Sequence, residues 1–96
     1  MATVRTHRYT VAGDQLEEFL GQRAELVGQW RAAGFDLVDA RLYRLDDGTY
    51  LDIWRWASEE VMAKAFGAMG EIPLVAATLG MTGDHSAVDG ELVDER

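Results

Sequence analysis

The chain contains no cysteine, which excludes disulfide bonds, thiolate nucleophiles and cysteine-ligated zinc or iron–sulfur clusters. No apolar run approaches the roughly 20 residues that a membrane-spanning helix needs. Residues 1–10 also lack the apolar stretch of a secretory signal peptide. These absences predict a cytoplasmic protein that is stabilised by side-chain packing.

Basic residues are scarce. Nine Lys and Arg residues stand against seventeen Asp and Glu residues, which leaves a net charge of -8. Such a charge repels phosphate backbones and anionic lipid headgroups, so we expect neither nucleic acid nor a membrane as a partner. The length of 96 residues, with 48% hydrophobic side chains, fits a single folded domain over residues 1–96.

Motifs of cofactor-binding enzymes are missing as well. The sequence has no G-x-G-x-x-G, no G-x-x-x-x-G-K-[ST] and no G-x-S-x-G. Nothing in the chain therefore supports a dinucleotide site, a P-loop or an α/β-hydrolase. We predict that the protein carries no haem, flavin or stoichiometric metal.

The first third of the chain predicts a strand and a long helix. Residues Thr3 to Val11 are rich in β-branched and aromatic side chains, which favour strands. The helix is predicted to begin at Asp14, which with Glu17 resembles a capping box, and to end at Gly34. Apolar residues recur at helical spacing between these ends, so the helix is amphipathic.

A hairpin and a second helix follow. Residues Phe35 to Leu45 and Thr49 to Trp56 alternate in character on either side of Gly48. The Asp-Gly pair at this point is typical of a tight hairpin turn, so two antiparallel strands are predicted. Ser58 is predicted to cap a helix that ends at Gly70.

The last part of the chain predicts a short helix and a final strand. Pro73 suits the first position of a helix through Leu79, with Gly80 in a left-handed conformation at its end. Residues Thr82 to Val93 form the last strand. The order β-α-β-β-α-β predicts an α+β, ferredoxin-like fold, in which a four-stranded antiparallel sheet has both long helices on one face. The other face is left uncovered.

Alternation along the strands divides their side chains into two sets. One set is mainly aliphatic and is predicted to face the helices: Val4, Thr6, Val38, Ala40, Leu42, Leu51, Ile53, Val88 and Leu92. The other is aromatic and charged and is predicted to occupy the uncovered face: Arg5, His7, Tyr9, Asp39, Arg41, Tyr43, Tyr50, Asp52, Trp54, Trp56, His85, Ala87 and Asp89. Large exposed apolar area usually marks a partner, so we predict a homodimer through this sheet face.

Several short motifs stand where a known family has them. They are Gly34-Phe35 before the second strand, Leu42-Tyr43-Arg44 within it, the Asp46-Asp47-Gly48 hairpin, and Trp56-x-Ser58-x-Glu60 at the start of the second helix. With the first strand and helix, the match covers most of the chain to about Phe66. On these motifs the chain resembles the antibiotic biosynthesis monooxygenase-like group of dimeric α/β barrels.

The resemblance implies a ferredoxin-like protomer that pairs sheet to sheet with a second copy, each half enclosing a pocket. It also implies a cofactor-independent monooxygenase of secondary metabolism, because some members oxygenate polycyclic aromatic polyketides such as anthrones to quinones without metal or flavin. The haem-degrading branch places an Asn on the first strand. This chain contains no Asn at all, so we exclude haem degradation.

The candidate site residues come from the aromatic and charged set. His7 is the candidate general base, because imidazole titrates near neutral pH and removal of a phenolic proton lets an electron-rich aromatic react with dioxygen. Arg41 is the candidate partner of the substrate oxyanion. Five further residues are expected to bind an aromatic small molecule: Tyr9, Tyr43, Trp54, Trp56 and His85.

Two of these assignments leave alternatives open. Trp54 and Trp56 share a face, so they could form either a flat wall for a planar ring or the dimer seam. His7 and His85 lie on strands that are neighbours in this fold, and with Asp52 or Asp89 they could in principle hold a metal. The chain has no close-spaced ligand pair, however, so no metal site is predicted.

Two other functions fit the same fold. One is a non-catalytic ligand-binding or structural dimer, which is favoured because residues Ser58 to Met69 contain no histidine where many family members carry one. The other is a polyketide cyclase that uses the same pocket without consuming oxygen.

Overall fold

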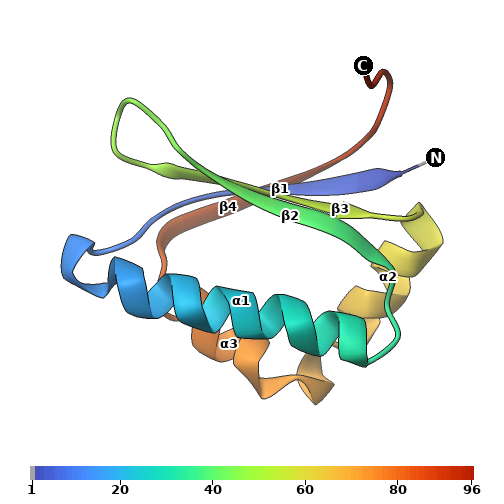
Figure 1. The fold of residues 1–96 in the computed structure, drawn as a ribbon, viewed down its shortest axis with the longest axis horizontal. Coiled ribbons are helices and arrows are strands. Elements are labelled where there is room, and N and C mark those ends of the chain that lie inside the picture. Colours follow the sequence, from blue (N-terminus) through green and yellow to red (C-terminus); the bar gives the residue numbers. More distant parts are fainter. Residues whose placement is uncertain (1) are drawn as a thin grey trace.

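The sheet and the helices form two layers (Figure 1). The computed structural model describes residues 2–96. Its elements are β1 (Thr3–Thr10), η1 (Gly13–Gln15), α1 (Leu16–Ala32), β2 (Leu37–Arg44), β3 (Tyr50–Trp56), α2 (Glu59–Gly67), η2 (Met69–Glu71), α3 (Pro73–Leu79) and β4 (Gly83–Glu91). All predicted strands and helices are therefore present.

The strand order is β2-β3-β1-β4, and every neighbouring pair is antiparallel. This arrangement confirms the predicted ferredoxin-like α+β fold. Figure 1 shows the helices on one side of the sheet, while no helix covers the other side. Within residues 2–96, no helix is both long enough and apolar enough to cross a membrane.

The turns and helix ends follow the local predictions in part. Ser58 caps α2, because its Oγ accepts a hydrogen bond from the backbone N–H of Val61 at 3.1 Å. Gly48 in the β2–β3 turn has a φ of +85°, which glycine tolerates best. The predicted capping box of α1 is wrong, since the turn Gly13–Gln15 precedes the helix and its caps make no side-chain hydrogen bond. The predicted left-handed conformation of Gly80 is also wrong, because its backbone is in the right-handed helical region with a φ of -63°.

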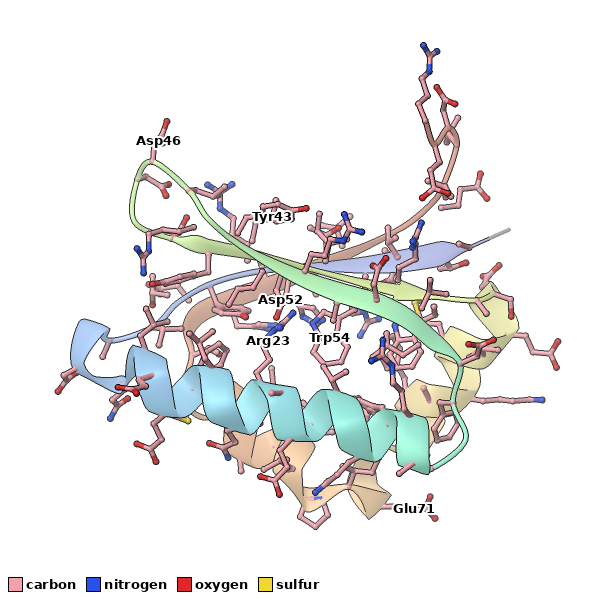
Figure 2. All side chains as sticks on the ribbon, in the orientation of Figure 1. Arg23, Tyr43, Asp46, Asp52, Trp54 and Glu71 are labelled. Carbon is pink, nitrogen blue, oxygen red and sulfur yellow. The ribbon has the colours of Figure 1, made fainter. Side chains whose placement is uncertain are left out.

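The predicted assignment of the two sheet faces is wrong for β1, β3 and β4. Tyr9, Tyr50, Trp54 and Trp56 were expected on the uncovered face, but each is at most 7% exposed and belongs to the core. Val88 was expected in the core, but it is 71% exposed. Figure 2 shows Trp54 between the sheet and α1. The aromatic set therefore faces the helices.

On β2 the assignment of the faces is largely correct. Ala40 pairs with Trp54, so it faces the helices as expected. Tyr43 is 46% exposed and lies on the uncovered side in Figure 2. A register shift between Leu37 and Asp39 changes the alternation at the start of the strand. Leu37 is consequently buried, whereas Val38, which was expected in the core, is 43% exposed.

Ring size explains why the aromatic set lies inside. The helical region presents the rings of Trp30 and Phe66 to the sheet, and both meet Trp56 edge to face, at 5.6 Å and 5.9 Å between ring centroids. Tryptophan buries more apolar area than valine or threonine, so placing it in the core gives the larger hydrophobic stabilisation. The charged residues of this face are tolerated there because they form ion pairs with one another.

The uncovered face is occupied by smaller side chains instead. Its central residues are Val4, Thr6, Leu51, Ile53 and Val88, with Tyr43 beside them on β2. The prediction that the aromatic set forms the dimer contact is therefore wrong, because the helices cover that set. Any pairing of sheets has to use this smaller, aliphatic surface.

Candidate functional site

A cavity lies between the sheet and the helices, with about 120 Å³ open to the centre of a water molecule. Its apolar lining consists of Phe19, Leu26, Trp30, Trp54, Trp56, Phe66, Met69, Val75 and Leu79. Its polar lining consists of Arg5, His7, Tyr9, Arg23, Asp52, Thr78, Thr82 and His85. An apolar hollow with a few converging polar groups is the usual form of a small-molecule site.

The mouth of the cavity lies between the end of α3 and the start of β4. Leu79 is 41% exposed and His85 is exposed, while the other lining residues are buried or half-buried. Thr82 connects these two positions and is half-buried. A ligand would therefore enter past Leu79 and His85.

A buried carboxylate is held at the inner wall of the cavity. Asp52 accepts two hydrogen bonds from Arg23, at 3.0 Å from Nε and 2.7 Å from Nη2, and one from the Tyr9 hydroxyl at 2.7 Å. Figure 2 shows Arg23 and Asp52 meeting between α1 and the sheet. Asp52 is only 3% exposed, so this bidentate pairing is what makes burial of its charge tolerable.

The environment keeps Tyr9 and Arg23 in their ordinary charge states. Burial, followed by the negative charge of Asp52, raises the pKa of Tyr9 well above its usual range, so its hydroxyl stays neutral. Burial alone would lower the pKa of Arg23, but the hydrogen bonds to Asp52, the negative charge of Asp52 and the contact with Tyr9 together outweigh it, and the pKa is raised. Tyr9 is therefore a hydrogen-bond donor and Arg23 a fixed cation.

A second ion pair engages Arg5, another residue that lines the cavity. Arg5 donates to Asp89 from Nε at 2.6 Å and from Nη2 at 2.9 Å. Its guanidinium lies over the ring of Phe66, 3.8 Å from the centroid. The hydrogen bonds from Arg5 hold the pKa of Asp89 below its usual value. Both arginines use Nε and Nη2 for a carboxylate, so the N–H groups of Nη1 stay outside these two pairings.

The two histidines are in direct contact. Nδ1 of His7 lies 2.9 Å from Nε2 of His85, so one ring donates a hydrogen bond and the other accepts it. The pKa of His7 is lowered from 6.5 to about 4, chiefly by burial; Asp52 and Asp89 oppose this shift, and His85 and Arg5 add to it. His7 is therefore neutral at physiological pH.

Two buried polar atoms of the lining residues have no hydrogen-bond partner among residues 2–96. They are Nε1 of Trp56 and Oγ1 of Thr78. A buried polar group without a partner costs about 1–3 kcal/mol. These groups add unused hydrogen-bonding capacity to the walls.

The structure brings most of the predicted site residues together. His7, Tyr9, Trp54, Trp56 and His85 all line the cavity. They meet there because β1, β3 and β4 are adjacent strands and all five side chains point to the helices.

Arg41 and Tyr43 do not belong to this group. Both lie on the uncovered face, where the Arg41 side chain is 68% exposed and 3.8 Å from Asp39. Arg41 and Tyr43 therefore do not line the cavity with His7, contrary to the expectation that all the site residues share one face of the sheet. In the pairing of β2 with β3, Arg41 lies opposite Ile53 and Tyr43 opposite Leu51, so both share the face of these aliphatic residues and not that of Trp54.

Arg23 was missed by the sequence analysis. It occupies the inward stripe of α1, since Phe19, Leu26 and Trp30 are buried at positions four before, three after and seven after it. An arginine at helical spacing within an apolar stripe was the available signal. Its partner Asp52 lies two residues before Trp54 on β3, so the alternation of side chains in a strand does predict that Asp52 and Trp54 share a face.

The carboxylates near the histidines are already engaged. Asp52 is held by Arg23 and Asp89 by Arg5. Among the described residues 2–96, no group of three or more His, Asp or Glu side chains could hold a metal ion. The expectation of a cofactor-free protein stays a prediction.

No protein-family model and no curated protein sequence matches the chain, so the comparison rests on solved structures. A monooxygenase from the gene ActVA-Orf6 of Streptomyces coelicolor, in complex with nanaomycin D, is similar with a TM-score of 0.74 and 19% identity, over 99% of this chain and 90% of that chain. SnoaB, a cofactor-independent oxygenase from Streptomyces nogalater, is similar with a TM-score of 0.71 and 21% identity, over 99% and 94%.

A further solved structure, described as an antibiotic biosynthesis monooxygenase, is similar with a TM-score of 0.69 and 16% identity, over 98% of this chain and 100% of that chain. These similarities span nearly the whole chain, so they confirm the family resemblance at the level of the fold. The chain has the ferredoxin-like fold of the antibiotic biosynthesis monooxygenase-like proteins.

Proposed function

We propose that the protein is a cofactor-independent monooxygenase that oxidises a polycyclic phenolic, anthrone-like compound in secondary metabolism. The observation that carries this proposal is the cavity, which combines a tryptophan wall with a neutral His7 and two arginines. The oxygenases with the same fold add support, since one is described as cofactor-independent and another was solved with nanaomycin D.

The wall suits a planar ring system. Trp54 and Trp56 stack with an interplanar angle of 25° and 6.4 Å between their ring centroids. Arg23 lies over the Trp54 ring at 5.5 Å from the centroid. A flat aromatic ligand entering past Leu79 would therefore meet aromatic faces on the sheet side and charged donors at its edge.

The proposed reaction needs proton removal and charge stabilisation. His7 accepts a proton from the enol or methylene of the ligand, and the N–H groups on Nη1 of Arg23 and Arg5 stabilise the resulting anion. The anion is the reductant and dioxygen the oxidant. One oxygen atom replaces two hydrogens to give a carbonyl, and the other leaves as water, so anthrone would give anthraquinone.

The charges in the cavity suit this sequence. Each arginine is already matched by a carboxylate, so the empty cavity is close to neutral and a neutral phenol meets no net repulsion. The low pKa of His7 makes it a weak base, so proton transfer depends on stabilisation of the anion by Arg23 and Arg5.

We further propose that the protein is a homodimer that pairs through the uncovered sheet face. That face carries Val4, Leu51, Ile53 and Val88 at its centre. The most exposed of these four is Val88, at 71% in the single chain. Apolar area of this kind on a sheet without a covering layer favours pairing with a second copy. The proposed contact would centre on aliphatic side chains, in contrast to the aromatic contact expected from the sequence.

Oxygen uptake with anthrone tests the enzymatic proposal. We expect stoichiometric consumption of dioxygen with formation of anthraquinone, and Trp54→Ala should mainly weaken anthrone binding because it removes a stacking surface. A non-catalytic binding protein is the second candidate, favoured by the weak basicity of His7. Binding of anthrone that quenches tryptophan fluorescence without any oxygen uptake would establish that alternative, and conversion without oxygen uptake would indicate a cyclase-like activity.

A further inference from the structure

His85 occupies a position that the proposed reaction has not yet used. It is exposed at the mouth of the cavity, while His7, to which it is hydrogen-bonded at 2.9 Å, is half-buried inside. The two rings lie 5.1 Å apart between centroids, on the neighbouring strands β1 and β4. The imidazole of His7 therefore lies inside the cavity, and the imidazole of His85 connects it to solvent.

The fold holds His85 in this orientation from the side as well. Its ring stacks on Tyr9, with an interplanar angle of 20° and 6.1 Å between centroids. Tyr9 is in turn fixed by its hydrogen bond to Asp52. The contact between the two histidines is thus part of a supported arrangement and does not depend on one flexible side chain at the surface.

We propose that His85 is the proton outlet of the cavity, which takes the proton from Nδ1 of His7 and passes it to solvent. The inference rests on the proposed function, because it requires that His7 accept a proton from the ligand. His85 does not touch the reacting atoms and acts through His7.

The transfer balances with one proton in and one proton out. In the starting state His7 carries its proton on Nδ1 and donates it to Nε2 of His85, which carries its own proton on Nδ1. When Nε2 of His7 takes a proton from the ligand, the Nδ1 proton of His7 moves to Nε2 of His85. His85 then releases its Nδ1 proton to water, and no electrons move.

The surroundings explain why an outlet is needed. The charged and titratable groups around His7 are Arg5 on its own strand, Asp52 on β3, Asp89 and His85 on β4, and Arg23 of α1 through Asp52. The two arginines neutralise the two carboxylates, so no unpaired anion is left to stabilise a histidinium at this depth. A proton that His7 receives therefore has to leave, and the contact with His85 is the route that the structure provides.

The variant His85→Gln separates proton transfer by His85 from a purely structural role. Glutamine retains a side chain that can hydrogen-bond to His7 but cannot accept and release a proton in this pH range. With anthrone as the probe, we expect oxygen uptake to fall by roughly 10², the lower end of what acid–base groups contribute, while the Kd for anthrone stays unchanged.

The matched control lies on the same strand. Glu91 is exposed at the far end of β4, on the same side of the sheet as His85 but outside the cavity lining. Glu91→Gln should leave oxygen uptake at the wild-type level. In His85→Ala, added imidazole should restore uptake, because the exposed position at the mouth gives it access to His7.

A measurement without turnover separates this inference from the proposed function. In ¹⁵N-labelled protein, NMR reports the exchange of the His7 ring N–H with water. We expect exchange to slow several-fold in His85→Gln relative to both wild type and Glu91→Gln. Unchanged exchange in His85→Gln overturns the outlet whether or not the protein oxidises anthrone. Slowed exchange in a protein that takes up no oxygen leaves the outlet standing and removes the proposed reaction.

Discussion

The two faces of the sheet differ in the residues at their centres, although the same four strands build both. The face under the helices holds rings and charges, with Trp54, Trp56 and the ion pair of Asp52 with Arg23 around the cavity. The uncovered face holds short aliphatic side chains such as Ile53 and Val88 at its centre, with the exposed Arg41 and Tyr43 on β2 beside them. A covered layer can enclose a cavity and neutralise its charges internally, whereas a bare layer offers a flat surface to a partner. Apolar character alone therefore does not tell which face is inside.

The largest effect is expected on the covered face, from the loss of Asp52. Asp52→Ala leaves Arg23, whose side chain is 13% exposed, without its counter-ion, and it also frees the Tyr9 hydroxyl. Breaking a buried ion pair by removing one partner costs about 3–5 kcal/mol. Urea unfolding at neutral pH measures the loss in the free energy of unfolding.

The matched control for this prediction is the exposed pair of Lys64 with Glu60, 3.0 Å apart on α2. Glu60→Ala should cost at most about 1 kcal/mol, since solvent screens both charges. If the two variants lose similar stability, the covered face does not depend on its buried charges.

How much of the fold and of the site the sequence predicts depends on the kind of interaction. The elements follow from local signals, such as the Ser58 cap and the glycine at Gly48, because these act within a few residues. The grouping of Trp54 with His7 follows from the period of two. The choice of face does not, because it depends on which rings the helices present and on pairs distant in sequence, such as Arg23 with Asp52. Arg41 shows a related limit, because its face depends on the pairing of β2 with β3, in which Ala40 lies opposite Trp54 and Arg41 lies opposite Ile53.

The next effect concerns the uncovered face. Val88→Asp places a charge at its centre, where pairing with a second copy would have to desolvate it at a cost of several kcal/mol. Val88 is 71% exposed in the single chain, so the fold itself should tolerate the change. We expect sedimentation to show a dimer of twice 10.7 kDa for the wild type and a monomer for the variant.

Val93→Asp serves as the control, because Val93 is 83% exposed beyond the end of β4. It should remain dimeric. A wild-type protein that sediments as a monomer at micromolar concentration rules out the proposed pairing, and the uncovered face then needs another explanation.

A smaller effect is expected from pH on the covered face. The pKa of His7 is lowered from 6.5 to about 4, so between these values the unfolded chain binds a proton that the folded chain does not. Stability is therefore complete above about pH 6.5 and decreases as the pH falls toward about 4, by on the order of 2–3 kcal/mol. Urea unfolding across this range measures the slope, and His7→Gln should flatten it. An equal slope in His7→Gln assigns the pH dependence to other groups.

The smallest effect is expected from Arg41, which the sequence placed in the site and the structure places on the uncovered face. Its side chain is 68% exposed, and its contact with Asp39 is long, at 3.8 Å, while Arg55 holds the same carboxylate at 2.6 Å. Arg41→Ala therefore leaves Asp39 with its main partner and should change the free energy of unfolding by less than about 1 kcal/mol. The Kd for anthrone should be unchanged, whereas Arg23→Gln should weaken both anthrone binding and stability. If Arg41→Ala instead reduces anthrone binding while Arg23→Gln does not, the ligand binds on the uncovered face and the cavity is not the site.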